Sequence, residues 1–214
     1  ALGSARKAAN YGKKVAMIEN KVIGGTCVNV GCVPKKVMYN LANFVEEAHI
    51  MQKMYAVQGV EHLKVDFTTF KLHRDAYVKR LNAIYHTNVE KANIDYIQGT
   101  ASFLEDKVVQ VQPSGQKYTA EHILIASGST PAKPYFEGSE FCMVSDDVFA
   151  LETLPASLIV IGGGYIGIEM SQIMHALGVK VTLVARDKVL RQIDQEVIEV
   201  LMSNIQKSGM DLRL

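Results

Sequence analysis

The chain has 214 residues, of which 48% are hydrophobic and 21% charged, with a formal net charge of +1. At about 150 residues per domain, this length predicts one large domain or two small ones. The composition excludes a disordered, collagen-like or disulfide-stapled protein. The small net charge and the lack of an apolar run of about 18 residues predict neither a nucleic-acid nor a membrane partner.

The N-terminal residues predict a helix followed by a strand. Residues 1–12 read as an amphipathic helix closed by Gly12, because glycine suits the position just past a helix end. Residues 13–18 read as a short buried strand that ends at Glu19. Residues 166–186 repeat this order of helix, glycine, strand and charged residue.

The two copies of this half-unit differ in what precedes them. The second copy follows a strand at 157–161 and a glycine-rich turn at 162–167, whereas the first begins directly with its helix. The last residues, 208–214, read as the start of another strand. We therefore expect the chain to be a fragment of a longer protein, with a first strand and its glycines before residue 1.

The residues between the two copies predict helices and then short strands. Residues 33–54 have a largely helical pattern, and 68–92 predict a long helix. Residues 94–125 predict short strands with turns at 105–106 and 113–115.

The second glycine-rich turn has the spacing of a dinucleotide site. Gly162, Gly164 and Gly167 follow an apolar strand and open a helix, and another strand comes about twenty residues later. Gly162 permits the tight turn, Gly164 lets a pyrophosphate approach the backbone, and Gly167 lets helix and strand pack closely. A purely structural turn is the alternative.

The charged residue after each following strand indicates the nucleotide. Arg186 and Arg191 suit the 2′-phosphate of NADP, whereas Asp187 between them leaves NAD open. Glu19, at the matching position of the first copy, suits a ribose without a phosphate, as in FAD or NAD. Ordinary surface charges are the alternative at both places.

Cys27 and Cys32 form the pair that indicates the reaction class. On a straight helix, residues five apart rise about 7.5 Å and point about 140° apart, whereas a disulfide needs Cα atoms within about 4.4–6.8 Å. The pair can bridge only if the segment bends, which Gly31 permits, and such a bridge is typical of a redox-active pair. A zinc site, for which Cys142 and His49 are isolated, and two inert thiols are the alternatives. We expect no metal, and we expect Cys142 to be a small buried apolar residue.

Residues 24–36, together with 162–169, resemble the pyridine-nucleotide-disulfide oxidoreductases, a flavoprotein family, and within it the glutathione reductase branch. The resemblance extends to 74–85 and 118–128. It implies an α/β fold of two consecutive Rossmann-like, three-layer dinucleotide-binding domains, both incomplete here.

The resemblance also implies a domain division. Residues 1–128 would form the FAD-binding domain with the redox dithiol, 129–154 a connection, and 155–214 the first part of the NADPH-binding domain. The interface domain would lie outside the chain, and the whole protein would be a homodimer. We expect a cytoplasmic location, with a mitochondrial copy as a further option.

Roles for individual residues follow from the same resemblance. Cys27 would attack the substrate disulfide, Cys32 would face the flavin, and Lys35, paired with Glu169, would lie near the flavin N5. Tyr165 would be a gate that moves aside for the nicotinamide. The implied FAD contacts are Glu19, Thr26, Cys27, Lys35, Ala101, Ser127 and Gly128. The implied NADPH contacts are Gly162, Gly163, Gly164, Tyr165, Ile166, Gly167, Glu169, Arg186 and Arg191.

The implied substrate is glutathione disulfide, with Tyr85 touching it. Gly3 and Arg6 match the small residue and the arginine that bind the anionic substrate in the glutathione branch, and Arg6 would repel the cationic trypanothione disulfide. Related reductases of thioredoxin, trypanothione or dihydrolipoamide, and a nucleotide-binding module without turnover, are the alternatives. Plain packing is the alternative for Tyr85 and Tyr165.

The chain departs from the family pattern in three respects. The first glycine motif and the C-terminal His-Glu pair of the family are not found in it, and the loop after Arg186 is one residue shorter than expected. We therefore expect this fragment alone to be inactive.

Overall fold

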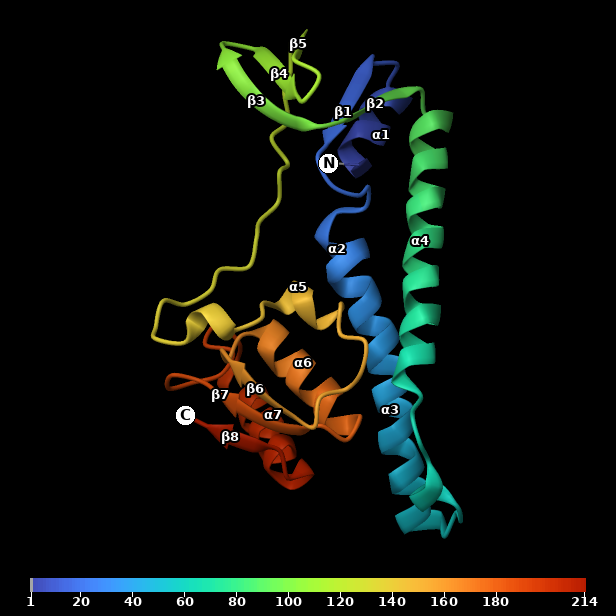
Figure 1. The fold of residues 1–214 in the computed structure, drawn as a ribbon, viewed down its shortest axis with the longest axis vertical. Helices are drawn as coiled ribbons and strands as arrows, with labels where there is room; N and C mark the ends of the chain where they lie inside the picture. Colours follow the sequence, from blue (N-terminus) through green and yellow to red (C-terminus); the bar gives the residue numbers. More distant parts are fainter. Residues whose placement is uncertain (1) are drawn as a thin grey trace. The chain divides into compact units, whose positions relative to one another are not determined.

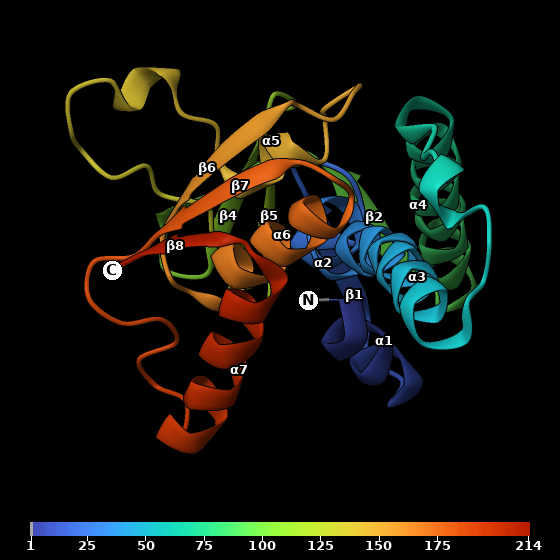
Figure 2. The same ribbon diagram turned by 90° about the horizontal axis from the view of Figure 1, so that it is seen from below.

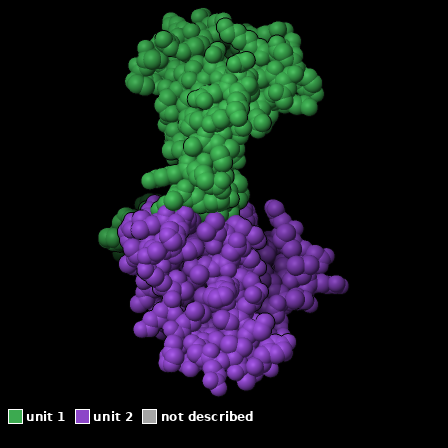
Figure 3. Space-filling model, turned by 90° about the vertical axis from the view of Figure 1, so that its right-hand side faces the viewer, with its two compact units in different colours: residues 1–34, 75–142 green, residues 35–74, 143–214 purple. Residues whose placement is uncertain are grey.

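The computed structural model describes residues 2–214, which form two compact units (Figure 3). Unit 1 comprises Ala1–Pro34, of which Ala1 lies outside the described residues, and Asp75–Cys142. Unit 2 comprises Lys35–Arg74 and Met143–Leu214. Two long helices, α3 (Cys32–Tyr55) and α4 (Phe67–Lys91), contribute residues to both units. The division predicted from the resemblance, at residues 128 and 154, stays a prediction.

Unit 1 is built on a parallel pair of strands, β1 (Val15–Glu19) and β2 (Ile94–Gln98), in which Glu19 lies opposite Gln98. Helix α1 (Leu2–Asn10) precedes β1, and Gly12 lies just past its end with a φ of 76°. The predicted order of helix, glycine, strand and acidic residue is confirmed.

A small apolar core holds these elements together. Met17, Ile23, Val89 and Ile94 are buried against one another, and apolar residues of α1 and the end of α4 pack around them. Burial of such side chains contributes about 1.5–3 kcal/mol each. The core thus fixes the residues just before the two cysteines, because Ile23 is one of its members.

An antiparallel sheet of three strands follows, with β3 (Thr100–Glu105), β4 (Val108–Gln112) and β5 (Gln116–Thr119) in sequence order (Figure 1). The predicted turns lie between these strands. The prediction that strands continue to Ile125 is wrong, because no strand is formed after Thr119 until β6. Leu124 and Ile125 are 66% and 72% exposed and pair with no other strand in the described part of the chain, so their apolar pattern has nothing to pack against. Unit 1 ends at Cys142, directly after the short 3₁₀ helix η2 (Ser139–Phe141).

Unit 2 contains a parallel sheet in the order β6 (Ser157–Ile161), β7 (Lys180–Val184) and β8 (Asp211–Arg213). Helix α6 (Tyr165–Ala176) connects β6 to β7, and α7 (Gln195–Ser208) precedes β8. Figure 2 shows both helices on the same side of the sheet, as right-handed crossovers in one direction require. The predicted α/β class, the strand at 157–161 and the final strand are confirmed.

Local signals explain where these helices end. The carboxylate of Asp194 accepts the N–H of Glu196 at 2.9 Å and caps the start of α7. Gly178 and Gly209 follow α6 and α7 with φ values of 91° and 78°, a conformation that favours glycine. No helix of residues 2–214 is long and apolar enough to span a membrane.

A buried arginine joins the helical part of unit 2 to the loop before its sheet. Arg74, on α4, is 1% exposed and donates to the carbonyl oxygen of Phe149 at 2.5 Å and to the sulfur of Met38 at 3.5 Å. Phe149 follows the short helix α5 (Ser145–Val148). Thr68 and Lys71 on α4 also contact Glu152 of this loop, while η1 (Val60–His62) lies in the connection before α4.

We expect the substitution Arg74→Met to lower the free energy of unfolding by about 2 kcal/mol or more, because it leaves the buried carbonyl oxygen of Phe149 without its charged donor. Thermal unfolding followed by circular dichroism measures this effect. Arg80→Met, at an exposed position of the same helix, serves as the matched control. Equal thermal unfolding midpoints for the two variants would contradict a stabilising role of the Arg74–Phe149 hydrogen bond.

Candidate functional site

The two cysteines lie on either side of a break between two helices. Cys27 belongs to α2 (Gly25–Val30), Gly31 interrupts the helix with φ −149° and ψ −122°, and Cys32 is the first residue of α3. A Cβ atom on Gly31 would stand 2.8 Å from the carbonyl oxygen of Thr26, so the bend requires glycine. The predicted bend at Gly31 is therefore present, and both cysteines are exposed thiols.

Glu19 lies at the carboxyl end of β1 in unit 1. Its Oε1 accepts the N–H of Lys21 at 2.9 Å. Tyr96, on the neighbouring strand, has a pKa raised above its ordinary value by desolvation and, secondly, by the negative charge of Glu19. Tyr96 donates to Gln98, which donates to the carbonyl oxygen of Lys21 at 3.0 Å. Sequence reasoning missed this chain of hydrogen bonds, which fixes the turn that follows Glu19.

The carboxylate of Glu19 fits a nucleotide ribose, because ribose hydroxyls donate to a carboxylate at the end of a parallel strand. The other residues implied as FAD contacts lie in varied surroundings. Thr26 is exposed on α2, Ala101 lies on the exposed strand β3, and Ser127 and Gly128 lie in the segment without helix or strand that follows β5. Their contacts with FAD stay predictions.

The glycine-rich turn of unit 2 has a steric reason at each position. Gly162 has a φ of 125°, which an L side chain rarely adopts. A Cβ atom on Gly167 would stand 2.1 Å from the carbonyl oxygen of Gly162, and one on Gly163 would stand 2.9 Å from the Cβ of Ala185. Gly164 faces open space at the start of α6. The turn therefore leaves its backbone accessible where a pyrophosphate would approach a helix N-terminus.

Tyr165 and Ile166 follow this turn as the first two residues of α6, and they are 68% and 43% exposed. Within the described residues, both side chains are therefore accessible beside the glycine-rich turn. The gate role of Tyr165 stays a prediction.

The loop after β7 is fastened to the same turn. The N–H of Leu190 donates to the carbonyl oxygen of Gly163 at 2.8 Å. In this loop Arg191 forms an ion pair with Asp187, which also accepts the N–H of Lys188 at 2.6 Å. Arg191 therefore has a partner within the loop, but both side chains are about half exposed, so its contact with a 2′-phosphate stays a prediction.

Asp187 carries its negative charge at neutral pH. Desolvation acts to raise the pKa of Asp187, but the hydrogen bonds from Lys188 and Arg191 and the charges of Arg191 and Arg186 outweigh it and hold the pKa below its ordinary value. The sequence indicates Asp187 only as a residue that leaves NAD open, and its bond to Arg191 was not predicted.

Lys35 and Glu169 form the ion pair implied by the resemblance. Lys35 Nζ lies 2.7 Å from Glu169 Oε1, which connects α3 to α6 within unit 2, and the two side chains are 25% and 41% exposed. A half-buried pair of this kind holds a lysine ammonium at a fixed position. Its place beside a flavin stays a prediction.

The residues implied in substrate binding belong to unit 1. Gly3 and Arg6 are exposed on α1, and a Cβ atom on Gly3 would have no atom within 4 Å. Tyr85, on α4, is half-buried and packs against the core cluster that contains Met17 and Ile23. Tyr85 therefore has a packing role, and its contact with the substrate stays a prediction.

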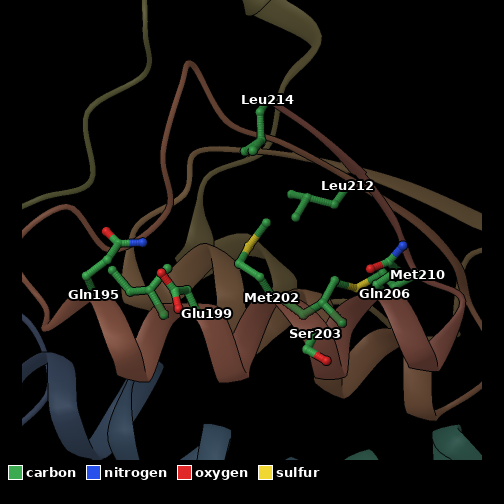
Figure 4. Close-up of a pocket in the computed structure, with 10 residues that line it drawn as sticks. Gln195, Glu199, Met202, Ser203, Gln206, Met210, Leu212 and Leu214 are labelled. Atoms are coloured by element: carbon green, nitrogen blue, oxygen red, sulfur yellow. The ribbon is translucent and has the colours of Figure 1, made fainter.

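A shallow hollow on unit 2 lies between α7 and β8 (Figure 4). None of its lining residues is among the residues predicted for the site. They are Gln195, Ile198, Glu199, Met202, Ser203, Ile205, Gln206, Met210, Leu212 and Leu214. Within residues 2–214, no group of three or more His, Cys, Asp or Glu side chains is arranged to hold a metal ion.

We expect Gly167→Ala to lower the free energy of unfolding by about 2–4 kcal/mol, because the new methyl group would overlap the carbonyl oxygen of Gly162. Gly164→Ala adds the same atom where nothing lies within 4 Å, and its unfolding midpoint should stay near that of the parent. Thermal unfolding compares the three proteins, and a midpoint of Gly167→Ala equal to that of Gly164→Ala would refute the steric argument.

Comparison with known proteins bears on the whole chain. The family model described as pyridine nucleotide-disulphide oxidoreductase matches residues 1–214. A glutathione reductase of Yarrowia lipolytica is 40% identical over 226 residues, which cover 99% of this chain and 47% of that protein. The HOCl-induced flavoprotein disulfide reductase RclA from Escherichia coli, solved as a Cu(II) complex, matches with a TM-score of 0.81 and 27% identity, over 100% of this chain and 46% of the RclA chain. The chain thus spans about half the length of these relatives, and it belongs to the pyridine nucleotide-disulphide oxidoreductase family.

Proposed function

We propose that the protein containing this chain is an NADPH-dependent flavoprotein that reduces glutathione disulfide. The observation that carries the proposal is the pair of exposed thiols, Cys27 and Cys32, on either side of the break at Gly31. A likeness to a glutathione reductase over 99% of the chain supports the choice of substrate. The dithiol argues against a nucleotide-binding module without turnover, which has no use for a bent pair of thiols.

The reductive step on the substrate uses the chain's own sulfur atoms. The thiolate of Cys27 attacks one sulfur of glutathione disulfide, which forms a mixed disulfide and releases one glutathione. The thiolate of Cys32 then attacks the sulfur of Cys27, releases the second glutathione and leaves the Cys27–Cys32 disulfide. Cys32 is placed at the N-terminus of the 24-residue helix α3, where the helix dipole favours negative charge.

FAD, when bound, supplies the two-electron chemistry that links a reduced nicotinamide to a protein disulfide. Glu19 would hold its ribose, with Thr26, Ala101, Ser127 and Gly128 as further contacts. Lys35, fixed by Glu169 at 2.7 Å, would present a positive charge to the flavin ring. Each of these roles belongs to the proposal.

The choice of NADPH rests on the loop after β7. Arg186 and Arg191 provide the positive charge that a 2′-phosphate requires, and Leu190 ties their loop to the glycine-rich turn. The turn itself would hold the pyrophosphate at the N-terminus of α6.

The choice of glutathione over other disulfides rests on charge. Arg6 is exposed on α1, so it would attract the carboxylates of glutathione disulfide and repel the cationic trypanothione disulfide. Reductases of thioredoxin or dihydrolipoamide remain the alternatives within the family.

A homodimer is the expected assembly of the whole protein. Helix α3 exposes Phe44, Ile50, Met51, Met54 and Tyr55 along its second half, and each of these side chains is at least 44% exposed. An exposed group of large apolar side chains marks an interaction surface in a protein of ordinary composition.

The two cysteines should differ in their reaction with glutathione disulfide. In the chain with Cys32→Ser, Cys27 should attack and remain trapped as a mixed disulfide with glutathione, because the second thiol is missing. Mass spectrometry of the cysteine peptides measures the adduct, with Cys142→Ser as the control for the third thiol. A larger adduct on Cys32 in Cys27→Ser than on Cys27 in Cys32→Ser would reverse the assigned roles.

The arginines should discriminate between nucleotides with and without a 2′-phosphate. Replacing Arg186 or Arg191 by Ala should weaken the binding of 2′,5′-ADP about tenfold and leave the binding of 5′-AMP nearly unchanged, because a charged phosphate contact contributes roughly 1.5–3 kcal/mol. Isothermal titration calorimetry measures both ligands, with Lys207→Ala on α7 as the control. Equal losses for the two nucleotides would argue against phosphate recognition.

A further inference from the structure

Two asparagine side chains link the helix of Cys27 to the long helix α4 within unit 1. The amide nitrogen of Asn82, on α4, donates to the carbonyl oxygen of Ile23 at 2.8 Å and to Oδ1 of Asn29 at 3.0 Å. A side-chain amide has two N–H donors. Asn82 therefore uses both donors on the chain that leads into α2 and on α2 itself. Asn29 lies on α2 between the two cysteines in sequence.

Asn29 extends this link to the backbone that leads into α2. Its amide nitrogen lies 2.9 Å from the carbonyl oxygen of Gly25 and 3.3 Å from those of Val22 and Ile23. The side chains of Asn82 and Asn29 therefore form one network, the Asn82–Asn29 network, which holds both the approach to α2 and α2 itself.

The short helix α2 depends on such anchors. It has six residues, and isolated helices of fewer than about 12 residues are marginal in water. Gly31 separates it from α3, and only Val28 among its residues is buried. The packing of Val28 and the Asn82–Asn29 network therefore both help to hold α2, and with it Cys27, in place.

We propose that Asn82 is a positioning residue for the redox pair, which through Asn29 keeps the Cys27 segment bent toward Cys32 when the thiols are reduced. The inference rests on the proposed function, since it takes the pair to be redox-active. Oxidation joins the two sulfur atoms and releases two protons and two electrons, which reduce oxidised dithiothreitol to its dithiol. Because the network already restricts the reduced segment, closing the bridge loses less conformational entropy.

The network should therefore shift the thiol–disulfide equilibrium toward the disulfide. In Asn82→Leu the reduced segment gains freedom, and we expect the equilibrium constant for oxidation to fall about tenfold. That change corresponds to a reduction potential about 30 mV less negative. Asn29→Ala should produce a shift in the same direction, and the double variant should shift little further, because the two residues act in one network.

The experiment equilibrates the chain in mixtures of reduced and oxidised dithiothreitol, alkylates the thiols and identifies the modified peptides by mass spectrometry. Peptide assignment separates Cys27 and Cys32 from Cys142. Asn88→Leu, a half-buried asparagine further along α4, is the matched control and should keep the parent equilibrium constant. Circular dichroism establishes that each variant is folded.

The outcomes separate the inference from the proposed function. An unchanged equilibrium constant in folded Asn82→Leu, or a shift toward the disulfide, would overturn the inference while leaving the redox pair intact. Where Asn82→Leu fails to fold, the same two results in Asn29→Ala overturn it. If the parent chain forms no Cys27–Cys32 disulfide in any mixture, the proposed function fails, and the inference fails with it.

Discussion

Both candidate sites depend on a glycine that packs against a backbone carbonyl oxygen so closely that no side chain would fit. In unit 2, the position of a Cβ on Gly167 is 2.1 Å from the carbonyl oxygen of Gly162, so α6 can start this close to β6 only with glycine there. In unit 1, a Cβ on Gly31 would be 2.8 Å from the carbonyl oxygen of Thr26. The first contact leaves a helix N-terminus open to a phosphate, and the second lets two thiols lie on either side of a helix break.

The two units share the same local order of elements but differ in the charge at the end of the strand. In unit 1, α1 is followed by Gly12 and by β1, which ends at Glu19, and in unit 2, α6 is followed by Gly178 and by β7, which precedes Arg186. A carboxylate accepts hydrogen bonds from ribose hydroxyls, whereas a guanidinium binds a phosphate. The residue at the end of each of the two equivalent strands thus has the charge that the proposed nucleotide of its unit requires.

Much of the fold could be predicted from the sequence because its signals are local. Apolar periodicity gave both long helices and the parallel strands to within a few residues, and the spacing of Gly162, Gly164 and Gly167 identified the turn. The prediction of a strand up to Ile125 was wrong. A strand forms only beside a neighbouring strand, and an apolar pattern alone does not supply one.

The parts of the site that could not be predicted depend on contacts between distant residues. Asn82 and Asn29 are 53 residues apart, and Arg74 and Phe149 are 75 apart, so no spacing along the chain relates them. The ion pair of Lys35 and Glu169 spans 134 residues and was expected only because the family resemblance implied it. Long-range polar contacts of this kind follow from the packing of elements, which local patterns do not specify.

The ion pair between Arg191 and Asp187 means that a phosphate would have to compete with a carboxylate for the guanidinium. If the proposed NADPH site is correct, a 2′-phosphate at Arg191 would have to replace or share the carboxylate that already pairs with the guanidinium. Asp187 is charged at neutral pH, and its pKa is lowered further, so binding of a phosphate would exchange one anion for another. The phosphate, with nearly two negative charges, has the advantage over a single carboxylate, and Arg186 adds to it. Because the carboxylate could also accept from ribose hydroxyls, we expect the loop to discriminate between the two nucleotides less sharply than two arginines without an acidic neighbour would.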